Sequence, residues 1–82
     1  MKVKVLGPGC AKCKALYGET AKAIASLSLE ADLEKVEKIE EIMAYRIMAT
    51  PALVIDGEVK SAGRVPSTAE ITSWLTAAGA KT

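Results

Sequence analysis

The chain has 82 residues and a formal net charge of +1, so it lacks the strong cationic field that nucleic-acid binding needs. Its length suits one domain, taken as residues 1–82, and its hydrophobic content of 50% suits a folded chain rather than a disordered one. No apolar run approaches the roughly 18 residues of a membrane span. We therefore expect a cytoplasmic monomer with no nucleic-acid partner and no membrane partner.

The residues from 2 to 27 predict a strand followed by a helix. KVKVL, at residues 2–6, is short and contains β-branched valines, and the Gly-Pro-Gly at 7–9 ends it. From residue 10 to residue 27 apolar side chains recur at steps of three or four, which is the spacing of one helix face. A helix is therefore expected to begin at the first cysteine.

The next stretch is ambiguous. The apolar side chains of LEADLEKVE, at residues 29–37, fit the period of a strand and also that of a helix. We interpret 29–37 as a strand, because one helix through the whole stretch would leave the first strand without a parallel neighbour. Residues 38–48, KIEEIMAYRIM, have the apolar spacing of a helix.

The last third predicts a hairpin and a helix. Two apolar runs within residues 51–63 flank Asp56-Gly57, which is the strongest short signal for a hairpin turn. Ser67 and Glu70 have the spacing of a capping box, and the helix that follows contains Trp74, which we expect in the core. The expected order of elements is therefore β-α-β-α-β-β-α.

Both cysteines of the chain lie at the expected start of the first helix. Cys10 and Cys13, at positions i and i+3, are neighbours on one helix face. Cys10 faces the unpaired N–H groups and the positive end of the helix dipole, and Lys12 and Lys14 add positive charge. We expect these groups, with Lys12 as the modulating side chain, to lower the pKa of the Cys10 thiol and make it a nucleophile. Cys13, one turn deeper, would keep its proton longer and act as the resolving thiol.

Three other interpretations of the cysteine pair exist. A disulfide that stabilises structure works through the loop it closes, and a four-residue loop contributes only about 1.9 kcal/mol. Two thiolates suit a soft metal such as Cu(I), whereas zinc needs four ligands and the chain has no histidine. An incidental pair is the third alternative. A redox dithiol is the interpretation that the spacing and the surrounding charge favour.

The sequence resembles the thioredoxin-like superfamily, and in particular its minimal archaeal and bacterial group of redox-active disulfide proteins. The matching residues extend over nearly the whole chain, and they are Gly7, Gly9-Cys10-x-x-Cys13, Thr50-Pro51, Asp56-Gly57 and Gly63-Arg64. The resemblance implies an α/β thioredoxin-like fold with a four-stranded mixed sheet flanked by helices. It also implies a catalytic dithiol made of Cys10 and Cys13.

Further site residues follow from the resemblance. In the superfamily the proline before the third strand has a cis peptide bond and lies against the dithiol, so the Thr50-Pro51 bond is expected to be cis. The backbone beside Thr50 and Pro51 would pair with an extended substrate polypeptide. Gly63 would let the loop after the hairpin approach the dithiol, and Arg64 is interpreted as a surface charge.

The sequence also departs from its larger relatives. Thioredoxins proper have a Trp before the first cysteine and a buried acid below the dithiol, whereas this chain has Gly9 and a KVKVL strand without an acid. Glutaredoxins bind glutathione through a Gly-Gly-acid turn, whereas AGRVPS, at residues 62–67, has one glycine and no acid. A separate NADPH-dependent reductase of the thioredoxin reductase type is therefore favoured over glutathione as the electron donor.

The leading hypothesis is a thiol–disulfide oxidoreductase that reduces disulfides in protein substrates through Cys10 and Cys13. It needs no cofactor and no metal. Two alternatives stay open: a carrier of a soft metal or metalloid that uses the same two thiolates, and a redox-sensing adaptor whose oxidised form binds a partner. The absence of a methionine beside the cysteines argues against the carrier.

Overall fold

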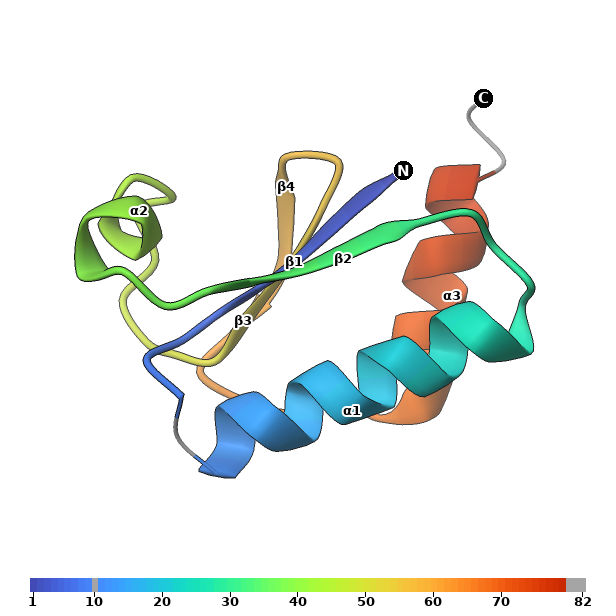
Figure 1. The fold of residues 1–82 in the computed structure, drawn as a ribbon, viewed down its shortest axis with the longest axis horizontal. Helices are drawn as coiled ribbons and strands as arrows, with labels where there is room; N and C mark the ends of the chain where they lie inside the picture. Colours follow the sequence, from blue (N-terminus) through green and yellow to red (C-terminus); the bar gives the residue numbers. More distant parts are fainter. Residues whose placement is uncertain (10, 80–82) are drawn as a thin grey trace.

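A computed structural model describes residues 1–9 and 11–79 of the chain. The elements follow the order β1 (Lys2–Leu6), α1 (Ala11–Ser26), β2 (Asp32–Val36), α2 (Ile39–Met43), β3 (Ala52–Ile55), β4 (Glu58–Ala62) and α3 (Thr68–Gly79). This is the expected β-α-β-α-β-β-α order (Figure 1). The fold class predicted from the sequence is confirmed.

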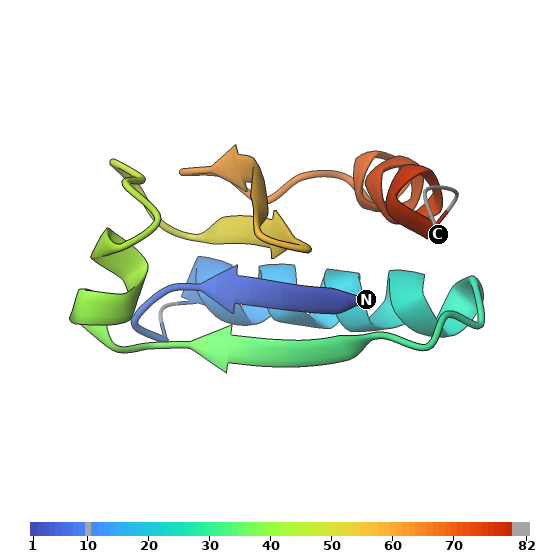
Figure 2. The same ribbon diagram turned by 90° about the horizontal axis from the view of Figure 1, so that it is seen from above.

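The four strands form one mixed sheet in the order β2-β1-β3-β4. β1 pairs with β2 in parallel and with β3 antiparallel, and β3 pairs antiparallel with β4. Helices α1 and α3 contact each other beside the sheet, while α2 lies at the other side of it (Figures 1 and 2). The β1–β2 pairing places the carboxyl ends of these two strands side by side, where α1 begins.

The ambiguity of residues 29–37 is resolved as predicted, in favour of a strand at Asp32–Val36. Backbone hydrogen bonds extend the ladder at both ends: the Asp32 N–H donates to the Met1 carbonyl, and the Gly7 N–H donates to the Val36 carbonyl, each at 2.9 Å. Pairing with β1 therefore selects the strand over the helix, although the apolar spacing of residues 29–37 fits both.

The helix predicted over residues 38–48 is too long, because α2 ends at Met43. The Tyr45 and Arg46 N–H groups bond three residues back, to Ile42 and Met43, which tightens the chain into a turn. Arg46 then has a φ of 57°, in the left-handed region that ends helices. Of the five residues of α2 only Ile42 is buried, so packing against the rest of the protein contributes little to the stability of this helix.

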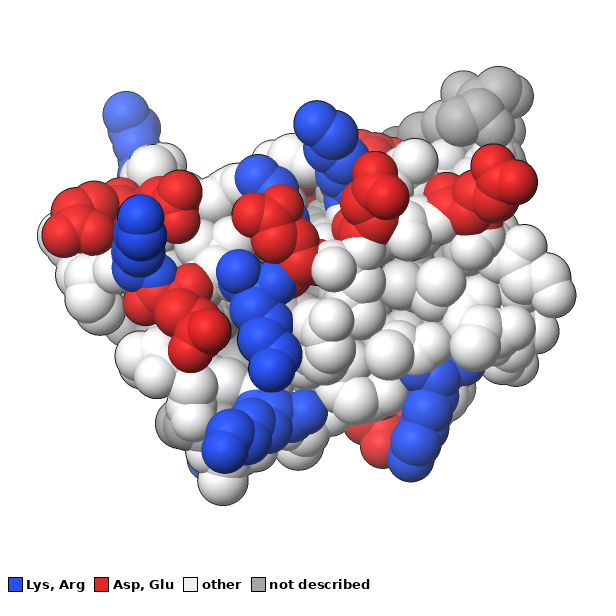
Figure 3. Space-filling view, viewed as in Figure 1, with Lys and Arg blue, Asp and Glu red and all other residues white. Residues whose placement is uncertain are grey.

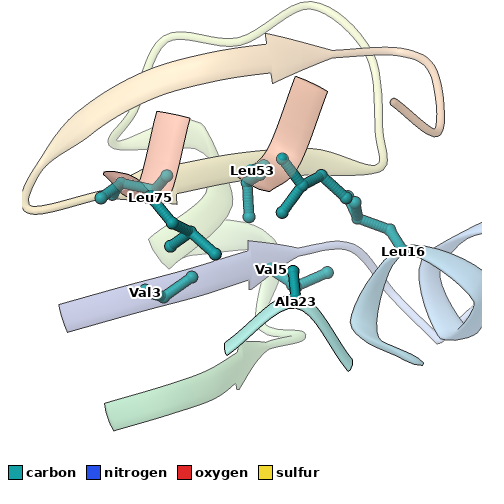
Figure 4. Packing of buried hydrophobic residues seen from close by; sticks show 8 residues of the cluster. Val3, Val5, Leu16, Ala23, Leu53 and Leu75 are labelled. Atoms are coloured by element: carbon teal, nitrogen blue, oxygen red, sulfur yellow. The ribbon is translucent and has the colours of Figure 1, made fainter. Parts of the chain in front are cut away.

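The sheet separates two groups of buried side chains, as the alternation along its strands requires. The larger group lies between the sheet and helices α1 and α3 (Figure 4); it comprises Val3, Val5, Leu16, Ala23, Leu53, Ile55, Ile71 and Leu75. The smaller group includes Leu6, Ala52 and Val54 of the alternate strand positions, together with Val36 and Ile42. Trp74 was expected in the core; it is half-buried and packs against the larger group.

The predicted hairpin and capping box are both present. Asp56 and Gly57 have positive φ values of 49° and 82°, the signs that a type I′ turn requires at both central residues. The Glu70 N–H donates to Ser67 Oγ at 3.2 Å, and the Ser67 N–H donates to Glu70 Oε1 at 3.2 Å. The start of α3 is therefore capped as the sequence indicates.

The surface carries charges of both signs. On the face seen in Figure 3, lysine or arginine and acidic side chains are interspersed over the side formed by β2 and α2. This face therefore presents no large area of one sign. In the part of the chain that the structure describes, no helix combines the length and the apolar character that crossing a bilayer would need.

Candidate active site

The candidate site lies where the turn after β1 meets the first turn of α1. Cys13 is the third residue of α1, is 5% exposed and is disulfide-bonded. Cys10 lies outside the described residues, so its expected place at the start of the helix is a prediction. The described half of the site is therefore built around the buried Cys13 sulfur.

Gly7 makes room for that sulfur. A Cβ placed on Gly7 would collide with Cys13 Sγ and would lie 3.1 Å from Cys13 Cβ and 3.9 Å from Pro51 Cα. The glycine is buried, and its lack of a side chain lets the turn lie directly against the cysteine. The sequence singled out Gly7 as a family match, but its contact with Cys13 appears only in the folded chain.

The Thr50–Pro51 peptide bond is cis, as the resemblance implied. Pro51 is buried, and its Cα would lie 3.9 Å from the same Cβ position on Gly7, so Gly7, Cys13 and Pro51 meet in one region. The Gly63 N–H donates to the Pro51 carbonyl at 2.9 Å. The structure thus brings together Cys13 and the loop of Thr50 and Pro51, and it connects Gly63 to that loop.

Gly63 lies against the loop that contains Thr50 and Pro51. It has a φ of 83°, which favours glycine, and a Cβ at this position would lie 3.0 Å from Ala49 Cβ. Among the described residues Gly63 therefore lies against Ala49, before Pro51, while its expected approach to the dithiol stays a prediction because Cys10 lies outside them. Its hydrogen bond to the Pro51 carbonyl makes Gly63 a support for the loop.

A cavity of about 50 Å³ opens beside Cys13. Its lining comes from β1, the turn, α1 and the end of β2, and consists of Val5, Gly7, Gly9, Cys13, Lys14, Lys35 and Glu37. Lys12, the modulating residue expected from the sequence, is exposed and does not line this cavity. The charged side chains that line the cavity together with Cys13 are thus Lys14, Lys35 and Glu37.

Lys35 and Glu37 were missed by the sequence reasoning. They lie at alternate positions, so both project to one side of the chain at the end of β2. In the parallel register Val5 pairs with Lys35, which brings this end of β2 to the turn before α1. The available signal was the rule that sites in such sheets form at the carboxyl ends of adjacent parallel strands.

Lys35 is held in place by an aromatic ring. Its Nζ lies 4.7 Å from the centroid of Tyr17, which is one helical turn after Cys13 on α1. This contact fixes one positive charge beside the cavity. Over residues 1–9 and 11–79, no group of three or more His, Cys, Asp or Glu side chains could hold a metal ion.

Arg64, interpreted from the sequence as a surface charge, forms an exposed ion pair. Its Nη2 lies 2.7 Å from Glu70 Oε2. The hydrogen bond from Arg64 and a second one from the Ser67 backbone lower the pKa of Glu70 from 4.5 to about 2. The pair joins the loop after β4 to the capped start of α3.

Comparison with known proteins finds relatives that match nearly the whole chain. The profile of the family described as "Thioredoxin domain" matches residues 1–76. A thioredoxin from Methanothermobacter thermautotrophicus is 37% identical over 75 residues, which cover 92% of this chain and 97% of the relative. A thioredoxin from Methanocaldococcus jannaschii is 32% identical over 73 residues, which cover 89% and 84%.

The fold and the buried cysteine beside a cis proline define a protein of the thioredoxin-like superfamily. The chain belongs to the thioredoxin family, as the matched profile and both relatives show. Membership of that family supports a general role in thiol–disulfide oxidoreduction.

Proposed function

We propose that this protein reduces disulfides in protein substrates through a dithiol formed by Cys10 and Cys13. The observation that carries the proposal is the environment of Cys13: its sulfur is buried against Gly7, with Pro51 beside it and a small charged cavity next to it. A resolving thiol needs such a protected position, because it must react only with the neighbouring cysteine.

The reaction proceeds in two exchanges. The Cys10 thiolate attacks a substrate disulfide, which forms a mixed disulfide and releases one substrate thiolate. Cys13 then attacks Cys10, which releases the second substrate thiolate and leaves Cys10 bonded to Cys13. The substrate gains two electrons and the dithiol loses two. The backbone beside Thr50 and Pro51 would hold the substrate in extended form.

The electron donor in this proposal is a separate NADPH-dependent reductase of the thioredoxin reductase type. Glutathione is disfavoured, because the turn at Gly63 and Arg64 lacks the second glycine and the acid of glutaredoxins. The protein would work in the cytoplasm as a monomer of one domain, residues 1–82, without cofactor or metal.

The test is reduction of insulin by dithiothreitol, with the wild type, Cys10→Ser and Cys13→Ser compared. We expect turnover by the wild type, no turnover by Cys10→Ser, and a trapped mixed disulfide with Cys13→Ser. Equal rates for the wild type and Cys10→Ser would overturn the proposal. Retention of stoichiometric Cu(I) against a chelator, without insulin turnover, would instead favour the metal carrier.

A further inference from the structure

In the resolving step the Cys13 thiol must lose its proton. A thiol attacks a disulfide as the thiolate, and Cys13 is buried, so a proton acceptor within the site would speed its attack. β1, which runs beneath the turn, carries no acid in its sequence KVKVL. An acceptor within the site would therefore come from another element.

Glu37 is the carboxylate that the fold brings to this position. The hydrogen bond from the Gly7 N–H to the Val36 carbonyl, at 2.9 Å, ties the residue before Glu37 to the turn. A Cβ placed on Gly9 would lie 3.1 Å from Glu37 Oε2, so the carboxylate lies directly against the residue that precedes Cys10. Glu37 and Cys13 also line the same cavity.

The other charged side chains that line the cavity are lysines, which cannot take up the Cys13 proton. Lys14, from α1, and Lys35, from β2, are ammonium groups, which donate protons and cannot accept one. Their positive charge favours a thiolate that forms on Cys13. Glu37 is thus the one carboxylate among the described residues that line the cavity.

We propose that Glu37 accepts the Cys13 proton during the resolving step, an inference that rests on the proposed function. In the mixed disulfide the Cys13 S–H bond breaks and its proton moves to the Glu37 carboxylate, directly or through one water. The Cys13 sulfur bonds to the Cys10 sulfur, and the bond from Cys10 to the substrate sulfur breaks. The substrate leaves as a thiolate, and Glu37 returns its proton to water.

The test separates the two exchanges with the reduced protein and the small disulfide dithiobis(nitrobenzoate). Attack by Cys10 releases a first coloured nitrothiobenzoate, and attack by Cys13 releases a second one. We expect Glu37→Gln to slow the second release by about 10²-fold, the lower end of the range for general bases, because Glu37 is exposed. The rate of the first release should not fall.

The matched control is Glu34→Gln, which makes the same change of charge on β2, three residues before Glu37. Glu34 lines a different cavity, with Lys4 and Tyr45, on the side of the sheet where α2 lies. Its second release should equal that of the wild type. Thermal unfolding of both variants shows whether either substitution disturbs the fold.

The pH profile of the second release gives a readout that a purely structural role would not change. Without an internal acceptor the thiol must ionise into water, so the logarithm of the rate should rise with a slope near one in Glu37→Gln. In the wild type the slope should be clearly smaller. Equal rates and equal slopes in the wild type and Glu37→Gln would overturn the role of Glu37. A wild type that releases no second nitrothiobenzoate would instead overturn the proposed function itself.

Discussion

The contact between Gly7 and Cys13 leads to a prediction for Gly7→Ala. The added methyl group would overlap Cys13 Sγ and would lie 3.1 Å from Cys13 Cβ. Both residues are buried, and Pro51 Cα would lie 3.9 Å from the added methyl group, so the methyl group enters a region that is already packed. Overpacking of this kind costs about 1–3 kcal/mol.

The cost should be larger in the oxidised protein than in the reduced one. When Cys13 is disulfide-bonded, its sulfur cannot rotate away and the backbone has to move. In the reduced protein a shift of about 30° in the Cys13 χ1 can relieve part of the overlap, at a cost of about 0.5–1.5 kcal/mol. Urea unfolding of both forms measures the difference. With an m value of about 1 kcal/mol per molar urea, the oxidised midpoint should fall by about 1–3 M.

Gly18→Ala is the matched control, because it adds the same methyl group within α1. A Cβ at Gly18 meets nothing within 4 Å among the described residues, and alanine favours a helix over glycine by about 1 kcal/mol. The two substitutions should therefore have opposite signs. An oxidised Gly7→Ala protein as stable as the wild type would refute the close contact.

Two predictions concern the start of α3. Ser67→Ala removes the side-chain cap on the Glu70 N–H and should lower the free energy of unfolding by about 1 kcal/mol, measured by urea unfolding; an unchanged value would contradict the cap. The pKa of Glu70 is about 2 in the folded chain, below its ordinary 4.5, so its carboxylate stabilises the fold above pH 4.5 and this contribution is lost as the pH falls toward 2. Glu70→Gln should therefore lower the melting temperature near neutral pH and match the wild type near pH 2, as followed by thermal unfolding across that range. A difference independent of pH would show that ionisation is not its source.

Much of the fold could be predicted because the residues that specify its turns and helix ends lie close together in the sequence. Asp56-Gly57 carries its own turn preference, and Ser67 and Glu70 cap a helix three residues apart. α2 was predicted too long for the opposite reason. The apolar spacing through Ile47 is that of a helix, but packing decides where a marginally stable helix ends. Here α2 ends at Met43, and Arg46, with its positive φ, changes the direction of the chain before Ile47.

The sequence by itself determined the order of elements and the position of Cys13 in the first turn of the first helix, since each depends on residues close together in the chain. The cis proline was implied by the family resemblance. Only the tertiary structure decided what surrounds Cys13. Gly7 meets its sulfur, and Lys35 of β2 and Glu37, directly after β2, line the same cavity because β2 pairs in parallel with β1. Strand pairing joins segments that local spacing does not relate, so the chemistry of the site emerges only when the sheet forms.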